Sequence, residues 1–349
     1  METTARHFEH WPIVGHDGAV DQLARAVHTD RVNHAYLFTG PEGVGRRTLA
    51  RNFAQALVCT APGDQRPCGD CSACRRAAAN TFPDISVLSL ETQAVDSDKK
   101  DSQNTVISIE SVRELRASVA LRPMESQWRI AVLEDVDRLS FNAYDALLKT
   151  LEEPPPFVVM LLIATEFAAL PETIRSRCRH INLEPVPRDV VAAELERRGA
   201  SSERAELVAR LTRGRIGRAL ALASDDDTLA ERAESVKNAL EMMRDPLNAL
   251  AEARRMADLY RRGQRDRVYT ELDLLLGLWR DVLLYKTGRA EDVSNIDVLD
   301  DLVTLSRGWT VGEIHSAVTA CMQGLRDLNV NVQARLALNA MVTQWPEPR

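Results

Sequence analysis

Three short apolar runs predict buried β-strands. They lie at Ala35–Thr39, Arg129–Leu133 and residues 157–164. Continuous apolar runs of this length are typical of strands in a parallel sheet that is covered on both faces. Apolar residues spaced by three and four positions predict helices at residues 49–57 and 111–121. The pattern therefore predicts an α/β domain with a parallel sheet and flanking helices.

The strand pattern disappears after residue 187. From residue 188 the apolar spacing is helical, and Gly214 and Gly217 predict a turn between helices. Residues 92–105 are polar, which predicts a mobile loop inside the α/β part. We therefore expect an α/β domain, a small helical domain and a larger all-α domain, at residues 1–185, 186–226 and 227–349.

Size and composition limit the class of protein. A chain of 349 residues is long enough for two or three domains. With 45% hydrophobic residues and a net charge of −7, it is expected to fold and not to be a globally basic nucleic-acid binder. No stretch approaches about 18 uninterrupted apolar residues, and the first residues lack the apolar core of a signal peptide. We expect a cytoplasmic protein with no membrane partner.

Residues 40–50 have the frame of a phosphate-binding loop. In the pattern G-x-x-x-x-G-K-[ST], glycines let backbone N–H groups surround the phosphates, a lysine reaches the β- and γ-phosphates, and a hydroxyl binds Mg²⁺. Here Arg46 takes the lysine position, Arg47 takes the hydroxyl position, and Thr48 lies one residue too late. The glycines of the frame are present: Gly40, Gly43 and Gly45. We therefore expect a nucleotide-binding shape without intrinsic ATPase activity.

An acidic pair follows the strand at Arg129–Leu133. Glu134 and Asp135 occupy the position of the Mg²⁺-binding and water-polarising carboxylates of a nucleotide-binding fold, but the usual Asp-Glu order is reversed. The reversal displaces each carboxyl group by about a bond length, in a site that tolerates little misplacement. Taken alone, an acidic strand end is better explained by a solvated loop. After the altered phosphate loop, we interpret it as the second half of the same site.

Arg46 and Arg47 allow three interpretations. They are neutral replacements in an inactive site, or they pair with Glu134 and Asp135 and fill the pocket, or they still hold phosphate weakly through their charge. We favour the first two together, because loss of the Mg²⁺ ligand impairs hydrolysis and a bulky guanidinium also impairs binding.

Four cysteines form the pattern C-x₈-C-x₂-C-x₂-C. Four thiolates this close can surround a tetrahedral Zn²⁺, and disulfides are disfavoured in a cytoplasmic protein. An iron–sulfur cluster is the alternative, because three cysteines at this spacing also resemble iron–sulfur ligation. A closed four-cysteine site leaves no position for water, so the zinc is expected to be structural. The ligands are Cys59, Cys68, Cys71 and Cys74.

Several segments together resemble the bacterial clamp-loader subunits of the AAA+ family. Two of them resemble that family's second sensor, at residues 214–220, and the end of its collar domain, at residues 329–338. The likeness covers nearly the whole chain. Besides the four cysteines, the other segments are residues 11–16, 34–45, 142–155 and 176–178.

The resemblance implies an AAA+ module that contains a zinc module at residues 59–74, followed by a helical lid and a helical collar. It also implies that the chain assembles with motor (gamma or tau) subunits and delta into a five-membered ring. The ring opens the sliding clamp and places it on primed DNA. Motor subunits have an intact phosphate loop, which this chain lacks, so it resembles a non-motor member. ATP and Mg²⁺ are then expected only in neighbouring subunits.

The resemblance also assigns roles to single residues. Arg177 lies in a Ser-Arg-Cys motif whose arginine reaches into a neighbour's ATP site, where a cation stabilises charge on the γ-phosphate. A surface arginine paired with Glu172 or Glu184 is the alternative. Thr165 occupies the first-sensor position and Arg218 the second. Both are expected to be structural remnants if the resident loop binds no ATP.

Two other functions are weaker alternatives. An autonomous AAA+ ATPase, or a gamma- or tau-like motor with an atypical phosphate loop, is disfavoured by Arg46 and Arg47. A zinc-dependent DNA-binding module is disfavoured by the net acidity and by a closed metal site. Nothing in the sequence resembles a polymerase site, so no polymerase activity is expected.

Overall fold

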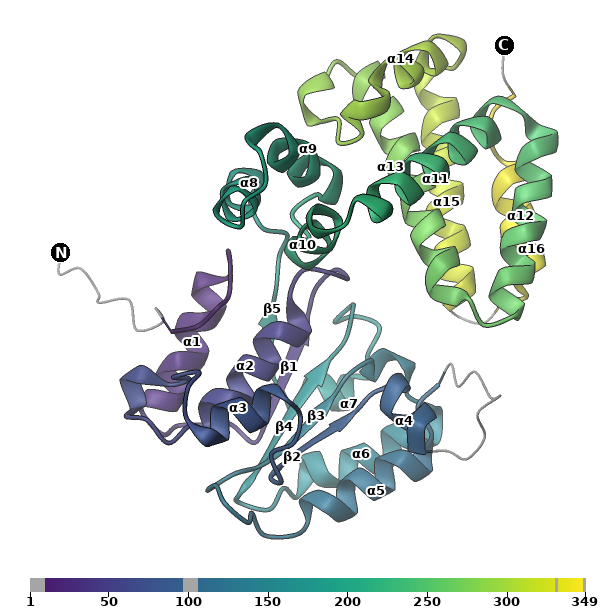
Figure 1. Ribbon diagram of the computed structural model, residues 1–349. Helices are drawn as coiled ribbons and strands as arrows, with labels where there is room; N and C mark the ends of the chain where they lie inside the picture. The colour runs from purple at the N-terminus through teal and green to yellow at the C-terminus, as the bar shows by residue number, and fades with distance from the viewer. Residues whose placement is uncertain (1–9, 97–105, 330–331, 348–349) are drawn as a thin grey trace. The chain divides into compact units, whose positions relative to one another are not determined.

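The computed structural model describes residues 10–96, 106–329 and 332–347 (Figure 1). Two compact units make up the chain. The first comprises the chain up to Glu194 together with Gly214–Arg218. The second comprises Leu195–Arg213 and the chain from Ala219 onward.

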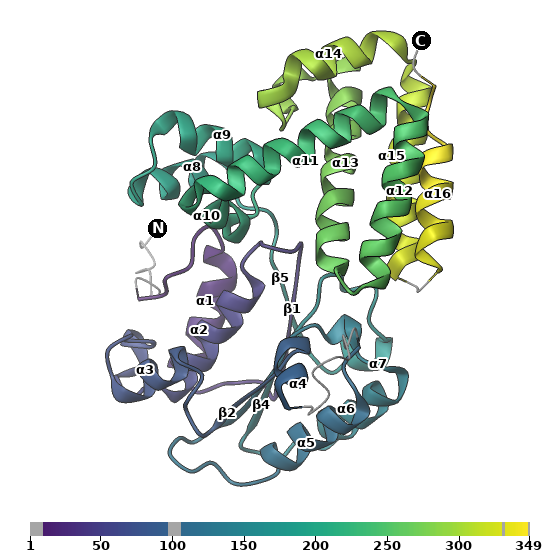
Figure 2. The same ribbon diagram turned by 45° about the vertical axis from the view of Figure 1, so that its right-hand side comes forward.

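The first unit is built on a five-stranded parallel sheet with the strand order β2-β3-β4-β1-β5 (Figure 2). The three strands predicted from the sequence are the central ones. The prediction missed β2 and β5, because these edge strands are short and most of their side chains are partly or fully exposed. The strands are β1 Ala35–Thr39, β2 Ile85–Leu88, β3 Arg129–Leu133, β4 Val158–Ile163 and β5 Arg179–Asn182.

Each central strand divides its side chains between two cores. Along β1, Tyr36 and Phe38 pack with Phe53 of α2 on one face, while Ala35 and Leu37 face α5 and α6 on the other. Figure 1 shows α1 and α2 on one side of the sheet and α5 and α6 on the other. Burial on both faces explains why these strands read as continuous apolar runs.

Helices cover both faces of the sheet and lead into the site. The predicted helix at residues 49–57 is confirmed as part of α2, and the one at 111–121 is confirmed by α5 except for its last two residues, because α5 ends at Val119. The elements are α1 Asp17–His28, α2 Arg46–Val58, η1 Gly63–Gln65, α3 Ser72–Ala78, α4 Leu90–Asp96, α5 Ile109–Val119, η2 Val136–Arg138, α6 Phe141–Glu152 and α7 Glu172–Arg175.

The predicted mobile loop at residues 92–105 is wrong at its start. Residues 92–96 belong to α4, and the Gln93 amide donates to the Val106 carbonyl and accepts from the Ser108 N–H. The polar side chain of Gln93 thus satisfies backbone groups just before α5. Residues 97–105 lie outside the described part of the chain.

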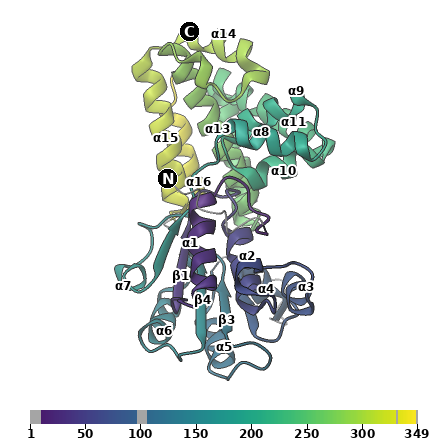
Figure 3. The same cartoon turned by 90° about the vertical axis from the view of Figure 1, so that its left-hand side faces the viewer.

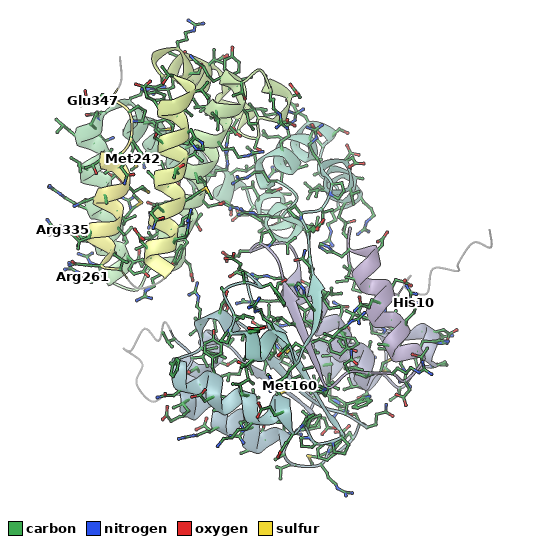
Figure 4. The ribbon with its side chains drawn as sticks, turned by 180° about the vertical axis from the view of Figure 1, so that it is seen from behind. His10, Met160, Met242, Arg261, Arg335 and Glu347 are labelled. Carbon is green, nitrogen blue, oxygen red and sulfur yellow. The ribbon has the colours of Figure 1, made fainter. Side chains whose placement is uncertain are left out.

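The second unit contains helices and no strand among its described residues, as the sequence predicted. Its core forms around Leu272, Trp279 and Leu338. Arg261 and Arg335 lie at the same end of α12 and α16, so these helices run antiparallel (Figure 4). α15 and α16 lie side by side (Figure 3). The helices are α9 Ser202–Thr212, α11 Asp226–Arg244, α12 Pro246–Arg261, α13 Arg265–Lys286, α14 Leu299–Gly308, α15 Val311–Asn329 and α16 Ala334–Thr343, with η3 Ala290–Asp292 and η4 Ile296–Val298.

Two further helices, α8 Arg188–Arg197 and α10 Ile216–Ser224, take residues from both units. Gly214 lies between α9 and α10, as predicted, with a φ of +75°. A Cβ there would lie 2.4 Å from the Val186 carbonyl oxygen, so a side chain does not fit. Gly217 lies inside α10 rather than in the turn.

The predicted fold class, an α/β domain with a parallel sheet and flanking helices followed by helical regions, is confirmed by this sheet and by the helices after it. None of the described helices combines the length and the apolar character needed to span a membrane. The domain boundaries at residues 185 and 226 stay predictions.

Candidate functional site

The loop between β1 and α2 has an unusual backbone. Gly40, Gly43 and Gly45 have φ angles of +143°, +77° and +113°. Only glycine adopts such angles without strain. At Gly40 a Cβ would also lie 2.2 Å from the Leu183 carbonyl oxygen. The glycine frame identified in the sequence therefore has a direct conformational role.

Two other segments contact this loop. The His16 imidazole lies with Nε2 2.8 Å from the Val44 carbonyl oxygen, and because a carbonyl only accepts, Nε2–H is the donor. The Gly217 N–H donates to the Gly43 carbonyl at 2.8 Å. A Cβ on Gly43 would lie 3.3 Å from the Arg218 Cβ, so the candidate second-sensor residue lies beside the loop.

Arg47 binds both carboxylates at the end of β3. Its Nε lies 3.1 Å from Glu134 Oε2, and its Nη2 lies 3.0 and 3.2 Å from the two Asp135 oxygens. Arg51, one turn later on α2, donates through Nη2 to Glu134 Oε1 at 2.9 Å. Glu134 is only 1% exposed, and guanidinium groups contact both of its oxygens. The pairing expected from the sequence is thus observed for Arg47.

The charges in this cluster act on the pKa of Arg47. Burial by itself lowers that pKa, but the negative charges of Asp135 and Glu134 outweigh it and raise the pKa above its ordinary value. Arg47 therefore stays cationic and neutralises the acidic pair. The two carboxylates have fewer free lone pairs for a divalent cation than an unpaired Asp-Glu site offers.

Arg46 behaves differently from its neighbour. It makes no ion pair with Glu134 or Asp135 within the described residues, so the pairing interpretation does not hold for it. Burial lowers the pKa of Arg46, and the charges of Asp137 and Glu42 act in the opposite direction. Thr48, the displaced hydroxyl residue, is exposed, and its carbonyl accepts from the Asn52 amide.

Thr165 follows β4 and hydrogen-bonds to the segment that follows β3. Its N–H donates to Asp137 Oδ2 at 2.9 Å, its hydroxyl donates to the same oxygen, and its carbonyl accepts from the Gly40 N–H at 3.3 Å. The candidate first-sensor residue therefore connects the phosphate-loop frame with the segment that follows Glu134 and Asp135.

Arg177 is held at the surface by groups from α6 and α7. Its Nη2 donates to Glu152 Oε1 at 2.8 Å, and its Nη1 donates to the Thr173 carbonyl at 2.9 Å. The alternative predicted from the sequence, an ion pair of Arg177 with Glu172 or Glu184, is therefore wrong. The side chain is 34% exposed.

The four cysteines form one cluster, and their sulfur atoms all lie within 4.8 Å of one another. The Sγ–Sγ distances are 3.6 Å for Cys59–Cys68, 4.0 Å for Cys59–Cys71 and 4.0 Å for Cys68–Cys74. A tetrahedral zinc with Zn–S bonds of about 2.3 Å separates its sulfur ligands by about 3.8 Å. The cluster can therefore hold a metal ion, and its geometry fits tetrahedral thiolate ligation.

Backbone N–H groups surround the cysteine sulfurs. The Cys68 N–H donates to Cys59 Sγ at 3.4 Å, and the Cys71 N–H donates to Cys68 Sγ at 3.4 Å. The Cys74 N–H donates to Cys71 Sγ at 3.3 Å. Burial raises the pKa of Cys71, but the N–H groups of Thr60 and Cys74 outweigh it and lower that pKa to about 6. Such donors stabilise thiolates and orient metal ligands.

The cysteine cluster is attached to the helix that starts at the loop. Cys59 caps the C-terminus of α2, whose first residues are Arg46 and Arg47. The Gln55 amide donates to the Cys74 carbonyl, and the Trp11 indole N–H donates to the Arg66 carbonyl, both at 3.0 Å. The cluster therefore anchors the end of α2 that lies away from the loop.

Comparison with known proteins finds similarity to subunits of DNA polymerase III. The tau subunit of DNA polymerase III from Escherichia coli is 33% identical over 234 residues, which is 64% of this chain and 34% of that protein. The Bacillus subtilis tau subunit is 28% identical over 295 residues, or 79% of this chain and 50% of that protein. Residues 15–187 match the family described as DNA polymerase III, delta subunit. Over these residues the chain is similar to subunits of DNA polymerase III.

The match covers only part of each relative. The chain spans between about a third and half of the length of these two tau subunits. Among solved structures, a gamma-subunit-related protein of Thermotoga maritima has a TM-score of 0.46 at 16% identity, over 93% of this chain and 97% of that one. The Bacillus subtilis clamp loader delta protein has a TM-score of 0.30 at 12% identity, over 93% and 98% of the two chains.

Most of the candidate residues of the first unit meet at the carboxyl ends of its central strands. Arg177 hydrogen-bonds to none of them in the described part of the chain, and the cysteine cluster lies at the opposite end of α2. The residues that meet are Gly40, Gly43, Gly45, Arg46, Arg47, Thr48, Glu134, Asp135, Thr165 and Arg218.

Sequence reasoning missed three residues of this group. Arg51 lies four positions after Arg47, so the two share a helix face, and this spacing was a usable signal. His16 lies in a segment that carries the family likeness, but its contact with Val44 depends on tertiary structure. Asp137 lies two residues after Asp135, and nothing in the sequence distinguishes it from an exposed acid.

A further missed residue, Asp84, stabilises the first unit next to β2. Its carboxylate is 0% exposed and accepts the N–H groups of Met124, Glu125 and Ser126 at 2.7–2.9 Å. The Arg129 guanidinium lies 3.2 Å away. Burial raises the pKa of Asp84, but these donors outweigh it and lower the pKa below its ordinary value.

Replacing Asp84 by asparagine should therefore lower the free energy of unfolding at neutral pH by about 3 kcal/mol, because one accepting oxygen becomes an NH₂ group that faces buried N–H donors and Arg129 loses its counter-charge. The folded-state pKa is below the unfolded one, so the stabilisation is present above the unfolded pKa and is lost as pH falls through the folded pKa. Urea unfolding at several pH values measures this. The exposed Glu114→Gln variant is the control, and an unchanged Asp84→Asn midpoint at neutral pH contradicts the prediction.

Proposed function

We propose that the chain is a delta-prime-type subunit of a bacterial DNA polymerase III clamp loader, which assists clamp loading without hydrolysing ATP itself. The observation that carries this proposal is the binding of Glu134 and Asp135 by Arg47. A guanidinium group holds the carboxylates that a working site uses for Mg²⁺ and water. The match of residues 15–187 to the delta-subunit family supports the same assignment.

The altered loop argues against Mg²⁺–ATP turnover at this site. A magnesium ion that approaches Glu134 has to displace Arg47 or Arg51 from a carboxylate that is 1% exposed. The loop also lacks a hydroxyl side chain at position 47, and Arg47 itself repels a cation. We therefore propose that ATP and Mg²⁺ are bound by neighbouring subunits only.

Arg177 is proposed to act on such a neighbour. A cation next to the γ-phosphate stabilises charge that develops during phosphoryl transfer. The side chain is partly exposed, and its five N–H donors are not all used by Glu152, Thr173 and Ser176. It can therefore keep its anchoring contacts and still present donors to a phosphate.

The remaining assignments follow from the same proposal. The partners are gamma or tau subunits and delta, and the sliding clamp and primed DNA are reached through the assembled complex in the cytoplasm. Residues 186–226 are proposed to be the lid, and residues 227–349 the collar that joins the subunits. The four cysteines are proposed to bind one structural Zn²⁺, because a closed set of four sulfurs leaves no position for water.

A second candidate function is an ATP-binding motor subunit with an atypical loop. The relatives named above are tau subunits, and Arg46 lies on the loop without an ion pair among the described residues. An unpaired arginine at the lysine position is available to a phosphate. Nucleotide binding by the isolated chain separates this function from the proposed one.

The test of the proposed function is ATP hydrolysis by a complex reconstituted from motor subunits, delta and this chain. The chain alone should show no turnover, and its addition should raise DNA-stimulated hydrolysis by the motor subunits. Turnover by the isolated chain, or no effect of adding it to the complex, contradicts the proposal.

A further inference from the structure

The Arg177 side chain is fixed from two sides. Glu152, the last residue of α6, accepts from Nη2 at 2.8 Å, and Thr173 of α7 accepts from Nη1 through its carbonyl at 2.9 Å. Both helices are anchored in the core, since Leu151 and Ile174 are 2% and 0% exposed. The guanidinium is thus held between two rigid supports at the surface.

We propose that Glu152 is a positioning residue that orients the Arg177 guanidinium toward the ATP site of a neighbouring subunit. This inference rests on the proposed role of Arg177 in that site. Glu152 itself does not touch the nucleotide in this proposal. It acts through its ion pair with Arg177.

The exposure of the pair favours orientation over stability as its role. The two side chains are 34% and 49% exposed, and ion pairs at that exposure contribute little to the folded state. Orientation is a separate effect, because an arginine has many rotamers and catalysis is sensitive to small displacements of a charged group. An arginine already held by a carboxylate and a carbonyl loses less freedom when a phosphate approaches.

Glu152 also gives Arg177 a defined geometry. The carboxylate contacts only Nη2, which leaves other N–H groups of the planar fork for phosphate oxygens. The neighbouring Glu153 carries the same charge and makes no ion pair with Arg177. It is therefore a matched control for a change of charge at the end of α6.

The experiment measures DNA-stimulated ATP hydrolysis by the reconstituted complex that contains Glu152→Gln, Glu153→Gln, Arg177→Ala or Glu152→Gln/Arg177→Ala. The part of the rate that Arg177→Ala removes is the Arg177-dependent hydrolysis. Glu152→Gln should lower the kcat of this part roughly tenfold with KM unchanged, because a misplaced group weakens only the transition state. Glu153→Gln should match the wild type, and the double variant should lose no more than Arg177→Ala.

Two further measurements separate positioning from a structural effect. Glu152→Gln should leave the thermal unfolding of the chain and its assembly with the motor subunits unchanged. Glu152→Asp, which keeps the charge, should recover part of the lost kcat. Wild-type or increased kcat in Glu152→Gln, while Arg177→Ala still impairs hydrolysis, overturns the positioning role and leaves the proposed function standing. No effect of Arg177→Ala overturns the trans role of Arg177 and the positioning role with it.

Discussion

Replacing Arg177 by alanine is expected to abolish ATP hydrolysis at the neighbouring site that this residue faces. An arginine supplied in trans to a phosphoryl-transfer site contributes about 10³ to 10⁵ in rate, so that site should lose at least roughly 10³-fold. Assembly of the complex should be unchanged, because Arg177 is a partly exposed side chain that, among the described residues, pairs with a half-exposed glutamate. DNA-stimulated hydrolysis by the reconstituted complex measures the effect.

Two variants make the measurement specific to the guanidinium. Arg177→Lys keeps the positive charge but lacks the planar fork, and we expect it to restore only a small part of the rate. Arg179→Ala removes a residue of the same charge that is more exposed and lies two positions later, and it should leave hydrolysis unchanged. Full activity of Arg177→Ala in a complex that assembles normally contradicts the trans role.

Removing the metal from the cysteine cluster is expected to unfold the region around α3 and to lower the stability of the first unit by several kcal/mol. Structural zinc sites of small modules depend on the metal for folding. Cys59 and Cys74 are buried, and the cluster links the end of α2 to α3. Without a cation, four sulfur atoms within 4.8 Å of one another are left with no shared partner. Thermal unfolding before and after treatment with a chelator measures the loss.

The metal content identifies the ion. Metal analysis of the purified chain should find one zinc and no iron per molecule, and Cys74→Ser should lose it. Cys178 lies outside the cluster, and burial raises the pKa of its thiol to about 12, so Cys178→Ala should keep a full metal complement. Iron with sulfide in the preparation supports the iron–sulfur alternative instead, and a chain without metal that melts like the wild type contradicts a structural role.

The fold could be predicted where burial was complete. The strands β1, β3 and β4 are buried along their whole length, so their apolar runs were sufficient. β2 and β5 lie at the edges of the sheet, where exposed positions weaken the pattern. Residues 92–96 of α4 were taken for part of a loop because this stretch is polar. The Gln93 amide satisfies backbone groups at Val106 and Ser108, which composition alone does not reveal.

The site was predictable in its residue types and less so in its contacts. The pairing of Arg47 with Glu134 and Asp135 followed from two motifs that must meet in such a fold. The pair Arg51–Glu134 and the pair Arg177–Glu152 join residues that are 83 and 25 positions apart. Such contacts depend on how α2 packs beside β3 and how α6 packs beside α7. The periodicity of the sequence does not predict how these elements pack.

The central claim is that the altered loop binds no Mg²⁺–ATP by itself. Calorimetric titration of Mg²⁺–ATP into the purified chain, alone and then reconstituted with a motor subunit, tests it most directly. The account predicts no binding by the chain alone and binding only in the assembly, where the motor subunit supplies the site. Micromolar binding by the isolated chain contradicts the account, because Arg46 then substitutes for the lysine and the chain is an ATP-binding motor subunit.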